Sequence, residues 1–115
     1  MASIAELIAK QVASAAGNIE IPASVKNQVL NGVSESILGS LTQTAAQAGG
    51  IDVIKALVTG KQAAASSPVT VLAGKLLAGK LGGFGLNATQ SSSVAGLVPV
   101  AMGMLSKVIK DQDGD

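Results

Sequence analysis

The stretch VKNQVLNGVSESILGSL, residues 25–41, decides the predicted fold. Its large apolar residues recur three or four positions apart, which places them along one side of an α-helix. They are Val25, Val29, Leu30, Val33, Ile37, Leu38 and Leu41. Pro22 suits the first turn of this helix, because a proline there gives up no hydrogen bond. Gly49 and Gly50 would break the helix soon after Gln47.

Two shorter helices are predicted on either side of this long one. Residues 4–15 carry apolar residues at helical spacing, and Ser3 with Glu6 forms the S-x-x-E capping box that starts a helix. Residues 50–60, GIDVIKALVTG, carry a third helix.

The next segment, residues 61–68, is small and polar and ends in proline, so it is predicted to be a loop. A fourth helix follows over residues 69–81, where LAGKL occurs twice in succession. Five residues turn a helix by about 500°, so Lys75 and Lys80 should lie roughly 140° apart around its axis.

A final helix is predicted after the glycine-rich break at residues 82–85. Asn87 and Gln90 form its capping box. Its apolar stripe comprises Val94, Leu97, Val98, Ala101, Met102, Leu105, Val108 and Ile109. Because the stripe stays in phase across Pro99, we expect one helix kinked there, or two stacked end to end. The predicted fold is therefore all-α, a compact bundle of about five to six helices.

Length and composition restrict the possible functions. The 115 residues suit one domain, which we place at residues 1–110, with an aliphatic core, because Phe84 is the sole aromatic residue. The chain has no cysteine or histidine, which excludes thiolate nucleophiles, disulfides and the usual zinc sites. All eight basic residues are lysines, and the net charge is +1. The absence of arginine disfavours sequence-specific DNA binding.

Neither an export signal nor a transmembrane segment is predicted. The stretch MASIAELIAK lacks a basic segment followed by an apolar run, and Glu6 interrupts its apolar residues. The apolar stretch at 94–105 is shorter than the roughly 20 residues that span a bilayer, and the one at 69–86 contains two lysines. We expect a cytoplasmic protein.

Two glycine-rich motifs resemble nucleotide-binding loops but lack their context. GKLLAGKL, residues 74–81, has Leu81 where a phosphate loop needs Ser or Thr, and GFGLNA, residues 83–88, follows no predicted strand. The internal acids Glu6, Glu20, Glu35 and Asp52 are scattered along different predicted helices, and no nucleophile stands beside a base. We therefore predict no enzymatic activity, no catalytic residues and no cofactor.

The terminal DQDGD, residues 111–115, resembles the start of an EF-hand calcium loop. Asp111, Asp113 and Asp115 would supply ligands one, three and five, after a helix that ends near Lys110. The turn glycine at position six and the bidentate Glu at position twelve do not occur in this chain. Two interpretations stay open: an acidic tail, or the truncated start of a loop that binds calcium only if the natural chain continues.

Most of the chain resembles a bacterial family of unknown function, the YidB-like group (domain of unknown function 937). The resemblance rests on Ala/Gln-rich helices in the first half, the Gly-rich LAGKLLAGKLGGFG, and an L-x-P-x-x-M/L-G pattern. In this chain the pattern is Leu97, Pro99, Met102 and Gly103. The resemblance implies an all-helical domain with a helix-turn-helix-like element and no established reaction.

These observations favour a non-enzymatic helical domain that acts through protein–protein contacts or self-association. One alternative is weak nucleic-acid binding, with Lys75 and Lys80 on phosphates and Asn87, Thr89 and Gln90 near bases. So few cations make this the weaker candidate. A further alternative is reversible association of residues 69–86 with a membrane surface, which the lack of tryptophan disfavours. The last is a longer calcium-binding protein.

Overall fold

Helices make up 79% of the protein, and no strand occurs among the described residues. The computed structural model describes the backbone of residues 3–113 and the side chains of residues 3–110. The elements are α1 (Ile4–Ala16), α2 (Lys26–Ala46), α3 (Gly50–Val58), the 3₁₀ turn η1 (Ala64–Ser66), α4 (Pro68–Leu81), the 3₁₀ turn η2 (Gly82–Phe84), α5 (Ala88–Ala95) and α6 (Leu97–Asp113). The all-α prediction is confirmed.

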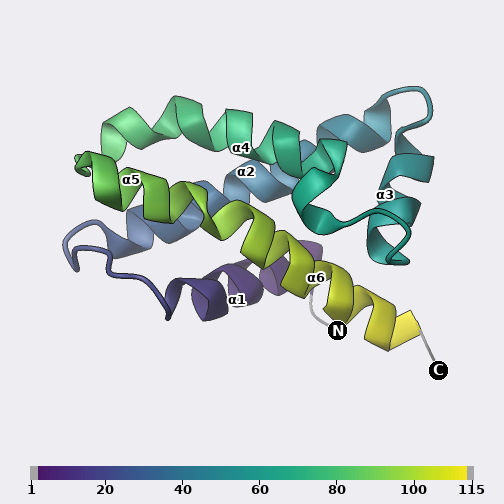
Figure 1. Cartoon of the computed structure of the whole chain (residues 1–115), viewed down its shortest axis with the longest axis horizontal. Coiled ribbons are helices and arrows are strands. Elements are labelled where there is room, and N and C mark those ends of the chain that lie inside the picture. Colours follow the sequence, from purple (N-terminus) through teal and green to yellow (C-terminus); the bar gives the residue numbers. More distant parts are fainter. Residues whose placement is uncertain (1–2, 114–115) are drawn as a thin grey trace.

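The long helix α2 holds the bundle together. It contacts α1, α3, α4 and α6, and Figure 1 shows α5 and α6 crossing in front of it, between α4 and α1, with α3 at one end. Its buried face includes Gly32, Ser36 and Ser40. The Ser36 hydroxyl donates to the Gly32 carbonyl and the Ser40 hydroxyl to the Ile37 carbonyl, so neither is left unpaired in the core.

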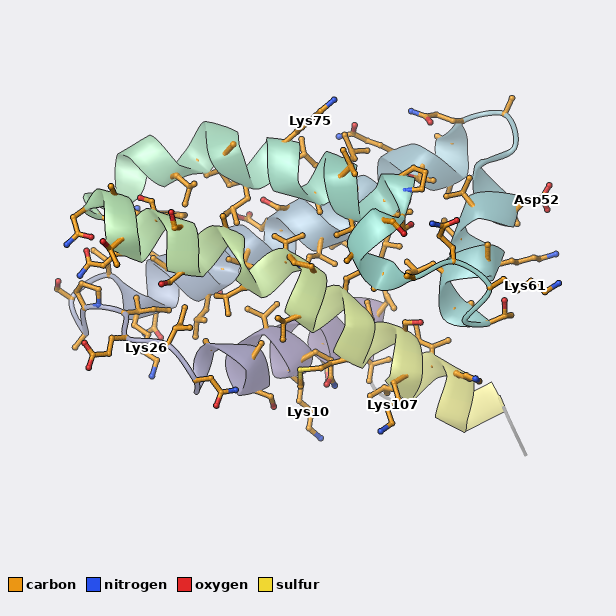
Figure 2. All side chains as sticks on the ribbon, in the orientation of Figure 1. Lys10, Lys26, Asp52, Lys61, Lys75 and Lys107 are labelled. Atoms are coloured by element: carbon orange, nitrogen blue, oxygen red, sulfur yellow. The ribbon has the colours of Figure 1, made fainter. Side chains whose placement is uncertain are left out.

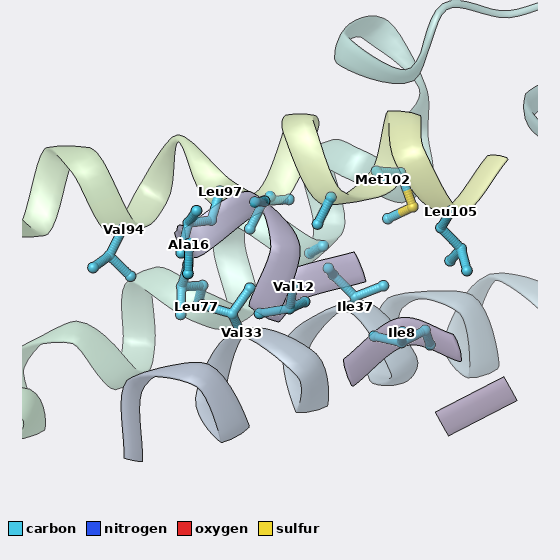
Figure 3. Close-up of a cluster of buried hydrophobic side chains, with 14 of the residues drawn as sticks. Ile8, Val12, Ala16, Val33, Ile37, Leu77, Val94, Leu97, Met102 and Leu105 are labelled. Atoms are coloured by element: carbon cyan, nitrogen blue, oxygen red, sulfur yellow. The ribbon is translucent and has the colours of Figure 1, made fainter. Parts of the chain in front are cut away.

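The core is aliphatic, as predicted, apart from one buried ring. Its central side chains come from α1, α2, α4, α5 and α6, and Figure 3 shows them meeting between the helices. The fully buried large side chains are Ile8, Ile37, Leu77, Met102, Val12, Val29, Val33, Val69, Val94 and Val98. Phe84, at the end of η2, is 6% exposed and joins this cluster.

The predicted break in the last helical segment is confirmed, and it lies at Gly96, three residues before Pro99. The axis bends by 19° at residue 96, and Pro99 falls in the first turn of α6. Pro99 cannot donate to the carbonyl of Ala95, four residues earlier, and its ring crowds that carbonyl. The interruption therefore appears one turn before the proline.

Two helix ends also differ from prediction. Pro22 opens a turn in which the Val25 N–H donates to the Pro22 carbonyl at 3.0 Å, and α2 starts only at Lys26. Val25 has φ −122° and ψ 4°, a conformation outside the helical region, which explains the later start. At the other end of the chain, α6 continues to Asp113, three residues beyond Lys110.

The link between α2 and α3 needs both of its glycines, for different reasons. Gly49 has φ +76°, in the left-handed region that suits glycine. A Cβ on Gly50 would lie 1.6 Å from the carbonyl oxygen of Thr44, so α3 can begin there only without a side chain. This pair sets the sharp turn that brings α3 back against α2 and α6.

One helical stretch in the described part of the chain, Ala88–Lys110, is long and apolar enough to cross a membrane by length and composition. A core helix of a globular protein passes the same test, and this stretch supplies Val94, Leu97 and Met102 to the core. The expectations of no transmembrane segment and of a cytoplasmic protein stay predictions.

Candidate functional site

An apolar pocket of about 300 Å³ opens at the end of the bundle where α3 packs. Helices α1, α2, α3 and α6 all contribute to its wall. The lining residues are Ile4, Leu38, Leu41, Thr42, Ala45, Ile54, Leu57, Val58, Met102, Leu105, Ser106 and Ile109. None of them carries an ionisable side chain.

The pocket has a buried floor and an exposed rim. Leu57, Met102 and Leu105 are nearly inaccessible to solvent and form its inner side. Ile4 is 44% exposed, and Ala45 is also exposed, so these two mark the opening. The site is therefore accessible from solvent while its interior is part of the hydrophobic core.

Two hydroxyl groups lie in the wall, and both already donate hydrogen bonds to the protein. Thr42 donates from Oγ1 to the Leu38 carbonyl at 2.9 Å, within α2. Ser106 donates from Oγ to the Leu57 carbonyl at 2.6 Å, from α6 to α3. Because both hydroxyl groups already donate to carbonyls, the surface of the pocket wall is almost entirely apolar.

The wall formed by α3 is attached by few buried side chains. Of this helix only Gly50 and Leu57 are buried, whereas Val53 and Ile54 are half-buried against the core. Ser106 gives the Leu57 carbonyl, in the last turn of α3, a second hydrogen-bond donor beside the Gly60 N–H. This contact therefore fixes the position of α3, and with it the shape of the pocket.

A second, polar cleft of about 430 Å³ lies between α2 and the end of α4. Its lining residues are Gln28, Asn31, Gly32, Glu35, Gly79, Lys80, Gly83 and Phe84. Glu35 and Lys80 both line this cleft, and both residues are exposed to solvent. An exposed pair of opposite charges is usual on a protein surface and does not define a ligand.

The residues predicted for nucleic-acid contact lie at two places. Lys75 and Lys80 project from α4, and Figure 2 shows Lys75 pointing away from the bundle. Asn87, Thr89 and Gln90 lie at the start of α5. The Asn87 Oδ1 accepts from the Gln90 N–H at 2.8 Å, and the Gln90 Oε1 accepts from the Asn87 N–H at 3.1 Å. The predicted capping box is confirmed, and nucleic-acid binding stays a prediction.

The predicted calcium ligands fall at the edge of the described structure. The backbone of Asp111 and Asp113 is helical, and Asp115 lies outside the described residues. Within residues 3–110, no group of three carboxylates is close enough together to hold a metal ion. Calcium binding at the C-terminal segment stays a prediction.

Sequence reasoning did not find the apolar pocket. Leu38 and Leu41 were predicted to lie in the buried stripe of the long helix, but in the structure both are only half-buried, at the pocket wall. The available signal was the width of that stripe, since Val29, Val33 and Ile37 alone complete one helix face. Which residues pack against Leu38 and Leu41 depends on where α3 lies after the turn at Gly49 and Gly50. The spacing of apolar residues in the sequence does not show this position.

In the comparisons with known proteins, no protein-family model, curated protein or solved structure matches this chain. The resemblance to the YidB-like group therefore stays a prediction that rests on the residues quoted above.

Proposed function

We propose that this chain is a non-enzymatic helical domain that acts through contacts with other protein chains, beginning with copies of itself. The observation that carries the proposal is the exposure of Ile51, Val71 and Val100, each about half accessible to solvent. They lie on α3, α4 and α6 and belong to neither of the two pockets. Charged residues make up only 13% of the chain.

The size of these side chains predicts weak association. Complete burial of a valine or isoleucine stabilises a complex by about 1.5–3 kcal/mol, and about half of that gain is already realised in the monomer. Covering three such residues thus contributes roughly 2–4.5 kcal/mol for each copy, which must also offset the entropy cost of association. Self-association should accordingly appear at high micromolar concentration.

Light scattering coupled to size-exclusion chromatography tests the proposal. We expect the mean mass to rise above 11.2 kDa as the protein concentration increases through the high micromolar range. Val71→Ser combined with Val100→Ser should weaken association at least tenfold. Thr89→Ala, an exposed change on α5, should leave it unchanged. A strictly monomeric protein at these concentrations would contradict self-association.

A further inference from the structure

We propose that the apolar pocket between α1, α2, α3 and α6 binds the alkyl chain of a small neutral molecule. This site is separate from the exposed residues that support self-association. Three properties of the pocket carry the proposal: the chemistry of its wall, its size, and its lack of charge.

The wall of the pocket has few groups that can form hydrogen bonds with water. Water in an apolar pocket is bound poorly unless two to four polar groups can form hydrogen bonds with it. Among the side chains that the structure describes, the only polar groups that line the pocket are the hydroxyls of Thr42 and Ser106, and both donate to backbone carbonyls within the protein. An apolar solute in the pocket would replace poorly bound water and gain contacts with Leu41, Met102 and Leu105.

The size of the pocket fits a small molecule. An enclosed apolar cavity of about 150 Å³ binds benzene, and small-molecule sites begin at about 300 Å³. This pocket, at about 300 Å³, matches the lower end of that range. Four helices surround it, so its outline suits a compact ligand better than the long side of a partner helix, which needs an extended groove.

The absence of charge sets the ligand class. None of the lining side chains is ionisable, so a buried carboxylate or ammonium group would lose its hydration without gaining a partner of opposite charge. Polar atoms of the ligand are tolerated only near the rim at Ile4 and Ala45, which solvent reaches. One hydroxyl group at one end of an alkyl chain meets this requirement.

The probe for the test is 1-octanol, added to methyl-labelled protein and followed by NMR at a concentration where light scattering shows a monomer. We expect saturable displacement of the Met102, Leu41 and Ile109 methyl signals. The signal of Val94, a buried residue that does not line the pocket, should not move. The matched probe 1,8-octanediol should bind about tenfold more weakly, because its second hydroxyl would be buried without a partner.

A matched pair of variants separates binding in the pocket from general hydrophobic adhesion. Ala45 is exposed at the rim, so Ala45→Phe should fill the opening and weaken octanol binding at least tenfold; Ala45→Leu is the smaller substitute if the phenylalanine variant does not fold. Ala13→Phe adds the same ring at an exposed site of α1 outside the pocket and should leave affinity unchanged.

Three results would overturn the proposal. These are no saturable displacement up to the solubility limit of 1-octanol, equal displacement at Val94, or undiminished affinity in Ala45→Phe. Displacements of the pocket signals that depend on protein concentration without octanol would assign the pocket to a second copy instead. Self-association is measured in the absence of octanol, so failure of the two proposals can be told apart.

Discussion

Gly32, in the middle of α2, lies directly against the ring of Phe84: a Cβ on Gly32 would be 2.6 Å from the ring Cζ. The two residues are far apart in the sequence, and both are buried. Glycine inside a helix costs about 0.5–1 kcal/mol relative to alanine. Here the missing side chain makes room for the chain's one aromatic residue.

Gly32→Ala should destabilise the protein despite its better helix propensity. Overpacking costs about 1–3 kcal/mol, so after the propensity gain we expect a net loss of about 1 kcal/mol in the free energy of unfolding. Urea denaturation followed by far-ultraviolet circular dichroism measures it.

Gly74→Ala is the matched control, because nothing lies within 4 Å of a Cβ built at this position inside α4. It should stabilise the protein by about 0.5–1 kcal/mol. If the ring causes the difference, Phe84→Leu should reduce the penalty of Gly32→Ala. An equal gain at both glycines would show that the ring moves aside freely.

Gly50→Ala should be far more damaging than Gly49→Ala. At position 50 the added Cβ meets the Thr44 carbonyl oxygen, a backbone atom that cannot move without displacing the end of α2. We expect a loss of about 3 kcal/mol or more. At position 49 the space is open and only the left-handed conformation is strained, which costs about 1–2 kcal/mol. Thermal unfolding of the two variants gives the comparison, and equal losses would contradict it.

Asn87→Ala should lower the free energy of unfolding by about 1 kcal/mol, because it removes the side-chain cap of α5. Asn87→Ser should restore most of this, since serine caps as well. Thr89→Ala, two residues later and exposed, should be close to neutral. Chemical denaturation gives the free energy of unfolding of the three variants. Equal free energies for Asn87→Ala and Thr89→Ala would show that the cap does not stabilise the protein.

Ser106→Ala should loosen α3 selectively. It deletes the bond to the Leu57 carbonyl, worth about 0.5–1.5 kcal/mol, while the Gly60 N–H still donates to that carbonyl. Hydrogen exchange should become several-fold faster for α3 amides and change little in α2. Thr42→Ala removes the other pocket hydroxyl, which bonds only within α2. If Thr42→Ala accelerates hydrogen exchange in α3 as much as Ser106→Ala does, the Ser106 contact does not anchor that helix.

The features that the sequence predicted well are local ones. Asn87 with Gln90 forms the complete predicted capping box, whereas of the box predicted at Ser3 and Glu6 the structure has the bond from the Glu6 N–H to the Ser3 hydroxyl, at 3.1 Å, and not the reciprocal one. Each of these depends on residues three positions apart. Helix boundaries differ from the prediction near two prolines. At Pro22 a turn precedes α2 and delays its start to Lys26, and the effect of Pro99 appears one turn before the proline itself.

The features that the sequence did not predict depend on long-range packing. The sequence around Gly32 does not indicate that the Phe84 ring of η2 will pack against it. Judged by helix propensity alone, a glycine at this position is unfavourable. The apolar pocket has the same origin, because Ile54 and Met102 meet only after α3 has turned back at the Gly49–Gly50 link. Periodicity identifies buried faces but not the gaps between them.

Because Phe84 is the one aromatic residue of the chain and is buried, its effects on spectra can be assigned without ambiguity. With no tryptophan or tyrosine, the chain has almost no absorbance at the wavelengths normally used to quantify proteins. In proton NMR, however, every ring-current effect in the folded state must originate from Phe84. The α-protons of Gly32 should therefore resonate away from those of the other glycines, and their return to ordinary values would report, without any label, the moment at which α2 and the loop after α4 separate.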